Sequence, residues 1–213
     1  TIVIDEQIHR NEAELIVLGN NSDIVFGNQS LFDALTENAG SITVAGRNAM
    51  FTRPFHNAGT LAIQGGTLDL GTSTNVNQGV LSGGTFTAFQ GGTLRFGRGV
   101  SVNEASLIFG GGSMPEVQNG LVTNRGTITV EGIAHFGPAN GTRNLRNEVG
   151  GTIRIKNGGH LSTTTYRNEG GLLEVDQASV LQLGRSLASG QTAVQEFGSG
   201  MTHVEGSLLF DQP

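Results

Sequence analysis

The sequence predicts an all-β fold: a right-handed parallel β-helix, or β-solenoid, with coils of about 20 residues. Apolar and polar side chains alternate in short runs such as residues 60–63 (TLAI) and 67–70 (TLDL), the period of a strand with one buried face. Gly or Asn interrupts each run after about five residues. A unit with an Asn, then a Gly and then an alternating run returns about every 20 residues, as repeat architectures require.

The composition fits a folded solenoid and excludes several other classes. Gly accounts for 34 of 213 residues but Pro for only 4, and no Gly-X-Y triplet continues through the chain, which excludes collagen. Charged residues make up 14%, too few to keep a chain unfolded by self-repulsion, and the net charge of −6 disfavours nucleic acid as a partner. The chain has no cysteine, which excludes disulfides and thiolate metal sites. It also has no apolar run of about 18 residues, so we expect no membrane-spanning segment.

Residues 1–36 are the least regular part of the chain. Residues 6–18 (EQIHRNEAELIVL) allow either a strand or a short helix, and a short apolar run follows at residues 23–27. A solenoid needs a cap over its open core and its free strand edge. We therefore expect an N-terminal cap or irregular first coils here. The regular repeat is expected to fill residues 37–213, as a segment of a longer protein.

From residue 38 onward, six coils are predicted to begin with an Asn that is soon followed by a Gly, a signature that the final coils lose. Both residues tolerate left-handed backbone angles that other residues avoid, so we expect them to form a corner of the coil. Asn side chains stacked from coil to coil can also bond to one another, while glycan binding is the alternative role. The predicted corner residues are Asn38, Gly40, Asn57, Gly59, Asn77, Gly79, Asn124, Gly126, Asn147, Gly151, Asn168 and Gly171.

Stacking the later coils in this register brings charged side chains together on the outer surface. The same stacking turns branched apolar residues toward the core in two inward columns, and it makes the second outward column alternate in sign. The inward columns consist of Ile128, Ile153 and Leu173, and of Val130, Ile155 and Val175. The two outward columns consist of Thr129, Arg154 and Glu174, and of Glu131, Lys156 and Asp176.

Five of these residues are the candidates for catalysis: Glu131, Lys156, Arg154, Glu174 and Asp176. Carboxylates, Lys and Arg on one outer sheet would suit the acid–base chemistry of a β-helix polysaccharide lyase or hydrolase. The same residues also fit a ladder of exposed ion pairs, worth roughly 0.2–1 kcal/mol each. Because no further catalytic motif supports the first interpretation, the ion-pair ladder is favoured and no enzyme activity is expected.

Two histidines are candidate metal ligands. His135 and His160 each lie nine residues after a coil-start Gly and are expected to stack, but the next coil offers Val180 at that place. A site with two ligands is incomplete, so we predict neither a metal nor a cofactor.

The runs NAGTLAIQGGTLDLG and NVNQGVLSGGTFTA resemble the repetitive passenger regions of bacterial autotransporters and of filamentous-haemagglutinin-like adhesins. The resemblance covers about residues 38–183 at the level of repeat style. It implies a right-handed β-helix, export to the cell surface, and a role in adhesion or scaffolding.

We therefore expect a non-enzymatic exported rod, a segment of a bacterial surface adhesin or of an extracellular filament or scaffold protein. Its location would be extracellular or at the bacterial cell surface. Its partners would be further copies of itself, or a glycan or protein of a host or matrix. The alternative is a carbohydrate-active β-helix (a polysaccharide lyase or hydrolase, or a phage-type depolymerase) or a glycan-binding module that uses a loop at residues 137–143 and exposed aromatic side chains such as Tyr166.

Overall fold

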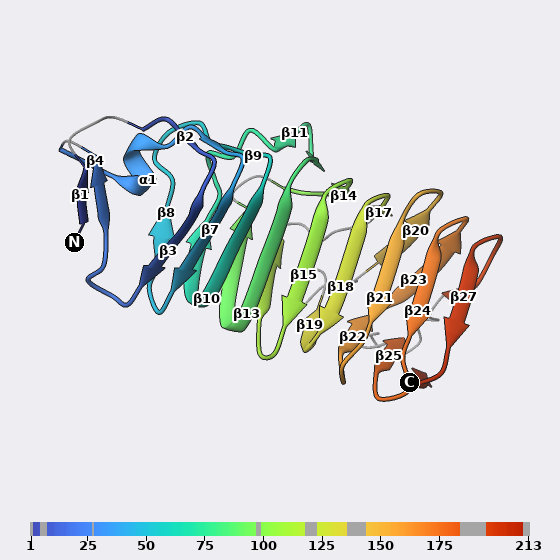
Figure 1. The fold of residues 1–213 in the computed structure, drawn as a ribbon. Helices are drawn as coiled ribbons and strands as arrows, with labels where there is room; N and C mark the ends of the chain where they lie inside the picture. Colours follow the sequence, from blue (N-terminus) through green and yellow to red (C-terminus); the bar gives the residue numbers. More distant parts are fainter. Residues whose placement is uncertain are drawn as a thin grey trace.

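The computed structural model is an elongated stack of β-coils (Figure 1). Nearly all of its regular structure is strand, and the strands stack in parallel as coils of about 21 residues, which confirms the predicted β-solenoid. The structure describes residues 2–4, 8–26, 28–96, 99–117, 123–135, 144–183 and 195–210.

The longest sheet follows the whole stack, and neighbouring strands in its main path are parallel. The short strands β8 (Ala49–Met50) and β16 (Met114–Val117) pair beside this path with β10 and β13. In order along the chain, the main path consists of β3 (Glu14–Leu18), β7 (Ser41–Ala45), β10 (Thr60–Asp69), β13 (Thr85–Phe96), β15 (Ser106–Gly110), β18 (Thr127–Glu131), β21 (Thr152–Ile155), β24 (Leu172–Val175) and β27 (Met201–Val204).

Three smaller sheets form the other sides of the coils. The first contains β2 (Arg10–Asn11), β6 (Glu37–Asn38) and β9 (His56–Asn57). The second contains β11 (Val76–Asn77), β12 (Val80–Leu81), β14 (Val102–Asn103), β17 (Thr123–Asn124), β20 (Asn144–Glu148), β23 (Thr165–Glu169) and β26 (Gln195–Glu196). The third contains β19 (Ile133–His135), β22 (His160–Thr163), β25 (Val180–Leu183) and β28 (Ser207–Phe210).

The core follows from the alternation of side chains along these strands. Ile128, Ile153 and Leu173 are register partners on β18, β21 and β24, and each is 0% exposed. Their stacking confirms the inward column that the repeat alignment predicts. Parallel strands lie about 4.8 Å apart, so branched apolar side chains in one column are in continuous contact along the stack.

The N-terminal region contains both a solenoid coil and additional structure. Strand β3 pairs in parallel with β7, so residues 14–18 form a strand of the stack and not a helix. A separate sheet of β1 (Ile2–Ile4), β4 (Ile24–Phe26) and β5 (Gln29–Ser30) lies with helix α1 (Leu31–Ala34) at the N-terminal end of the stack (Figure 1). Ser30 caps α1 by accepting from the Phe32 N–H, and α1 buries Leu31, Phe32 and Ala34. Within the described residues no helix is long and apolar enough to span a membrane.

A ladder of buried Asn side chains lies at one corner of the coils. The Nδ2 of Asn38 donates to the Oδ1 of Asn57 over 2.7 Å, and that of Asn103 donates to the Oδ1 of Asn124 over 2.9 Å. Each amide therefore joins its own coil to the next one, and the buried polar groups are satisfied. We call this set the Asn ladder; its members are Asn11, Asn38, Asn57, Asn103, Asn124, Asn147 and Asn168, all buried.

The ladder differs from the predicted corner set at Asn77, which is exposed. Asn77 and Val80 pair as an antiparallel hairpin across Gln78 and Gly79, whose φ angles of 48° and 81° suit a two-residue turn. The buried Leu81 is the register partner of Asn103 and therefore takes the ladder position in this coil.

Buried Asn75 compensates at this gap in the ladder. Its Oδ1 accepts from the Asn57 N–H over 2.7 Å, and its Nδ2 donates to the Asn57 carbonyl over 2.8 Å. The polar groups of Asn57 therefore remain bonded although the next coil supplies no ladder Asn.

Most predicted corner glycines are required for a reason other than the one proposed. A Cβ on Gly59 would lie 2.0 Å from the Gly40 carbonyl oxygen, and one on Gly126 would lie 2.2 Å from that of Ala105. Neither Gly59 nor Gly126 has a positive φ. Close approach of consecutive coils, and not a left-handed backbone, therefore selects Gly here.

Candidate functional site

The five predicted catalytic candidates come together on the outer surface, on β18, β21 and β24 or, for Lys156 and Asp176, directly after the last two of these strands. Arg154 has Thr129 and Glu174 as its register partners, and Glu174 is paired in turn with His203 on β27. This confirms the first outward column and extends it by one residue. We call the group of Glu131, Arg154, Lys156, Glu174, Asp176, His203 and Glu205 the outer charge stripe.

The opposite charges of the outer charge stripe are paired at short range. Arg154 Nε lies 2.6 Å from Glu174 Oε2, and Lys156 Nζ lies 2.9 Å from Glu131 Oε1. The four side chains are between 33% and 46% exposed, so water and salt screen both pairs. The predicted ion-pair ladder therefore exists in the folded chain.

Asp176 is held by two backbone N–H groups, and no ion pair of 4 Å or less to it is found within the described residues. Its Oδ2 accepts from the Asn157 N–H over 2.7 Å and its Oδ1 from the Ala178 N–H over 3.2 Å. The Ser179 hydroxyl and these two N–H groups lower the pKa of Asp176 below its ordinary value. Because a general acid must keep its proton near neutral pH, Asp176 is unsuited to that role.

A shallow cavity of about 240 Å³ lies over this stripe. The side chains of Arg154, Lys156, Glu174 and Asp176 line it, together with His203 and Glu205 from the last described coil. Its walls therefore offer acceptors and donors to a hydroxyl-rich ligand. Acid–base chemistry here would first have to release Arg154 or Lys156 from its carboxylate partner.

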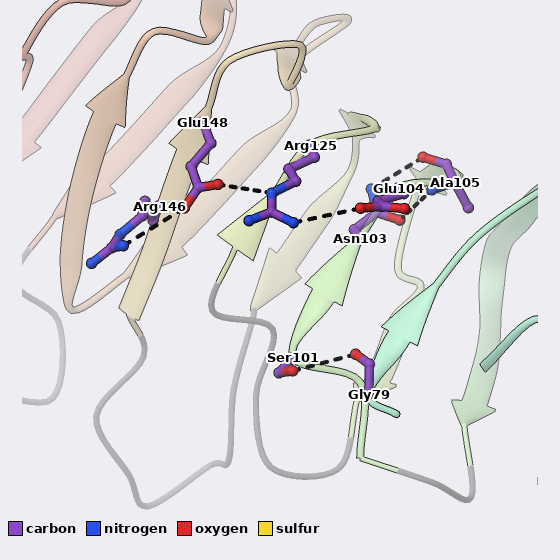
Figure 2. A network of polar contacts seen from close by, with 8 residues as sticks. All are labelled: Gly79, Ser101, Asn103, Glu104, Ala105, Arg125, Arg146 and Glu148. Carbon is purple, nitrogen blue, oxygen red and sulfur yellow. Dashed lines mark hydrogen bonds and ion pairs between the residues drawn. The ribbon is translucent and has the colours of Figure 1, made fainter. Parts of the chain in front are cut away.

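A second charged network lies on the neighbouring sheet, and sequence reasoning did not single it out (Figure 2). Arg125 lies between two carboxylates, with Nε 2.8 Å from Glu148 Oε2 and Nη1 3.6 Å from Glu104 Oε1. Arg146 continues the network to Glu148 at 3.6 Å and to Glu169 at 3.5 Å. The recurring Arg-Asn-Glu tripeptide at residues 146–148 and 167–169 is the sequence signal that points to it.

This second network changes the acidity of its members. The hydrogen bond and charge of Arg125 lower the pKa of Glu148, and Glu148 in turn raises the pKa of Arg125. The network also flanks the Asn ladder, because Asn124 precedes Arg125 and Asn147 precedes Glu148. Its geometry is that of a ladder that holds adjacent coils in register.

The two histidines do not stack on one another. His135 is the register partner of Ser162, whereas His160 is paired with Ile133 and Val180. The turn that contains Asn157 and Gly158 lengthens the connection between β21 and β22. The residues of β22 therefore pair with β19 in a different register from the one that the repeat alignment predicts. The His160 Nε2 lies 3.0 Å from Gln182 Oε1, a contact within the fold. In the part of the chain that the structure describes, no three His, Cys, Asp or Glu residues are placed to hold a metal ion.

The prediction that Tyr166 is exposed and contributes to a glycan-binding surface is wrong. Tyr166 is 0% exposed, so it cannot stack on a sugar ring, and its ring lies 5.8 Å from that of Phe197. Residues 137–143, the other part of that surface, lie outside the described residues.

Comparison with known proteins assigns the chain to no family. No family model matches the chain, and no curated protein or solved structure is significantly similar to it.

Proposed function

We propose that this chain is a non-enzymatic β-solenoid rod, a segment of a bacterial surface adhesin or of an extracellular filament or scaffold protein. The observation that carries the proposal is the Asn ladder. Asn124, for example, donates from Nδ2 to Asn147 Oδ1 in the next coil and to the carbonyls of Gly126 and Thr152. Cross-links of this kind, repeated along a stack, oppose bending and the separation of coils.

The charged residues support the same proposal. A catalytic site needs groups that are free to meet a substrate, but Arg154 is paired with Glu174 and Lys156 with Glu131. Pairs of this kind are typical of exposed ladders that align strands. A location outside the cell is proposed together with this role. It fits a chain without cysteine, and the partners would be further copies of the chain, or glycans or proteins of a host or matrix.

The proposal is tested by incubation with a panel of acidic and neutral polysaccharides, followed for both binding and chain length. We expect every polysaccharide to keep its length. Shortening that is lost in Lys156→Met or Glu174→Gln would overturn the proposal, and Glu169→Gln in the second network is the matched control. Binding without shortening would support an adhesive rod, and its absence would favour a scaffold.

A carbohydrate-active β-helix remains the second candidate because of one observation. The shallow cavity gathers Arg154, Lys156, Glu174 and Asp176 on a single face. The same assay decides between the candidates, since only an enzyme produces shorter chains.

A further inference from the structure

We propose that Asn157 is a site of spontaneous deamidation that adds a negative charge to the outer charge stripe. Asn157 precedes Gly158 in an exposed turn between β21 and β22. The turn is closed by the Gly159 N–H, which donates to the Lys156 carbonyl over 3.0 Å. This position therefore combines a reactive sequence with an exposed backbone.

The reaction is an attack of the Gly158 backbone nitrogen on the side-chain carbonyl carbon Cγ of Asn157. A new C–N bond forms, the bond from Cγ to Nδ2 breaks, and ammonia leaves with the proton of the attacking amide. Water then opens the five-membered imide at one of its two carbonyls, which gives aspartate or isoaspartate at position 157. Gly favours the attack because it places no side chain beside the nucleophilic nitrogen.

The nucleophile is available at this turn. A Cβ on Gly158 would meet no atom within 4 Å, so the space around this residue is open. The Gly158 N–H makes no hydrogen bond in the part of the chain that the structure describes. Asn157 Nδ2 donates to Glu131 Oε1 over 3.3 Å, and that hydrogen bond is exposed to water.

The Asn ladder shows the opposite arrangement. Asn124 is 0% exposed, and the next backbone nitrogen, that of Arg125, donates to the Asn103 carbonyl over 2.8 Å. The Ala58 N–H, which follows Asn57, donates to the Asn38 carbonyl over 2.7 Å in the same way. Attack at a ladder position therefore requires the coils to separate first, whereas attack at Asn157 does not.

The product changes the charge of the stripe. A carboxylate at position 157 would replace an amide that donates to Glu131, beside the Asp176 oxygen that accepts from the Asn157 N–H. Lys156 would then face additional acidic oxygens, and the attraction between residue 157 and Glu131 would become a repulsion. The outer charge stripe thus becomes more acidic with the age of the molecule.

The test is peptide mapping by mass spectrometry after the folded full chain is held in mildly alkaline buffer made with water enriched in heavy oxygen. We expect heavy oxygen to enter the peptide with residue 157, as a mixture of aspartate and isoaspartate, about tenfold faster than any peptide of the Asn ladder. The Asn157→Gln variant, whose longer side chain disfavours ring closure, should keep its amide. The two other Asn–Gly pairs, at residues 119–120 and 140–141, are followed as separate peptides.

A parallel incubation in urea supplies the reference rate for the unfolded chain. Retention of the Asn157 amide in the folded chain, while the same peptide reacts in urea, would overturn the proposal. That result would mean that the positive φ of 57° at Asn157 holds its side chain away from the attacking nitrogen.

Discussion

Asn124 Nδ2 donates a hydrogen bond of 2.9 Å to Asn147 Oδ1 in the next coil, although the two residues lie 23 positions apart in the sequence. Both side chains are 0% exposed. Asn124 also accepts at its Oδ1 from Asn103 Nδ2 over 2.9 Å, so it is bonded on both sides.

Replacing Asn124 with Ala should lower the free energy of unfolding by about 2–4 kcal/mol, because buried partners in both neighbouring coils lose their bonds. Urea denaturation followed by circular dichroism measures this loss. The control is Asn77→Ala, which alters an exposed hairpin residue and should cost less than about 0.5 kcal/mol. Equal losses in the two variants would show that the ladder adds no stability.

Gly59→Ala should destabilise the stack by at least about 2 kcal/mol or prevent folding, since its Cβ would lie 2.0 Å from the Gly40 carbonyl oxygen. Gly111→Ala is a matched control because its Cβ would meet no atom within 4 Å and its φ is not positive. Melting temperatures of the two variants give the comparison. A Gly59→Ala protein as stable as Gly111→Ala would contradict the close approach of coils.

The Arg125–Glu148 pair should make stability depend on pH on the acidic side. Because the pKa of Glu148 is lowered in the folded chain, its contribution is present above the pKa of the unfolded chain and is lost as the pH falls through the folded value. Carbon-detected NMR titration of Glu148 should show a higher midpoint in Arg125→Gln than in the natural chain. Glu174 serves as the internal control, since Arg125 forms no pair with it. An unchanged Glu148 midpoint would mean that Arg125 does not hold this carboxylate in solution.

Tyr166 provides a single optical probe, because the chain has 1 Tyr and no Trp. Burial raises its pKa, and the nearby Asn147 side chain opposes this effect only in part. The folded chain therefore favours the neutral phenol, a contribution that is present below the unfolded pKa and lost as the pH rises toward the folded value. We expect the phenolate absorbance to appear only as the chain unfolds in alkali. A gradual rise at the pKa of free tyrosine, with circular dichroism unchanged, would contradict its burial.

The Tyr166→Phe variant tests the hydroxyl alone. The Tyr166 hydroxyl is buried and makes no hydrogen bond of good geometry within the described residues. Its removal should therefore leave the free energy of unfolding unchanged or slightly raised, because no bond is lost. A loss of more than about 1 kcal/mol in urea denaturation would indicate a partner such as a bound water.

The columns of the solenoid could be predicted from sequence because their physical cause is local. Strand alternation has a period of two, and stacking repeats it in each coil, so aligned runs place Ile128, Ile153 and Leu173 correctly. The same reasoning brought Arg154 and Glu174 together.

The sequence prediction of the coil corners does not include the two Asn ladder residues that have no Gly soon after them. Asn11 and Asn103 are each followed by Glu-Ala, so the Asn–Gly signature does not occur at them. In these coils Ala13 and Ala105 occupy the place that Gly takes elsewhere, and it is their carbonyls that Gly40 and Gly126 approach. Whether a position requires Gly thus depends on how closely the backbone of the preceding coil approaches it. The residues next to that position in the sequence do not reveal this distance.

Turn length is the other cause of error. The hairpin at residues 77–80 has the same Asn-x-Gly letters as a coil corner, but its turn residues have positive φ angles and it leaves the ladder. The turn at Asn157 likewise separates His135 from His160. Insertions of a few residues preserve the core columns but shift the register of strand pairing in the neighbouring sheet. Only the three-dimensional structure shows the size of this shift.

The Asn ladder also gives the rod a chemical direction. Asn11, Asn38, Asn103, Asn124 and Asn147 each donate toward the next coil along the chain, and Asn168 ends the series by donating to the Met201 carbonyl and the Thr202 hydroxyl. In a partly assembled stack, the ladder Asn at the C-terminal edge therefore presents an amide donor to the next coil. The ladder Asn at the N-terminal edge presents an amide oxygen, which is an acceptor. The two ends of the rod are thus distinguishable by hydrogen-bond polarity alone.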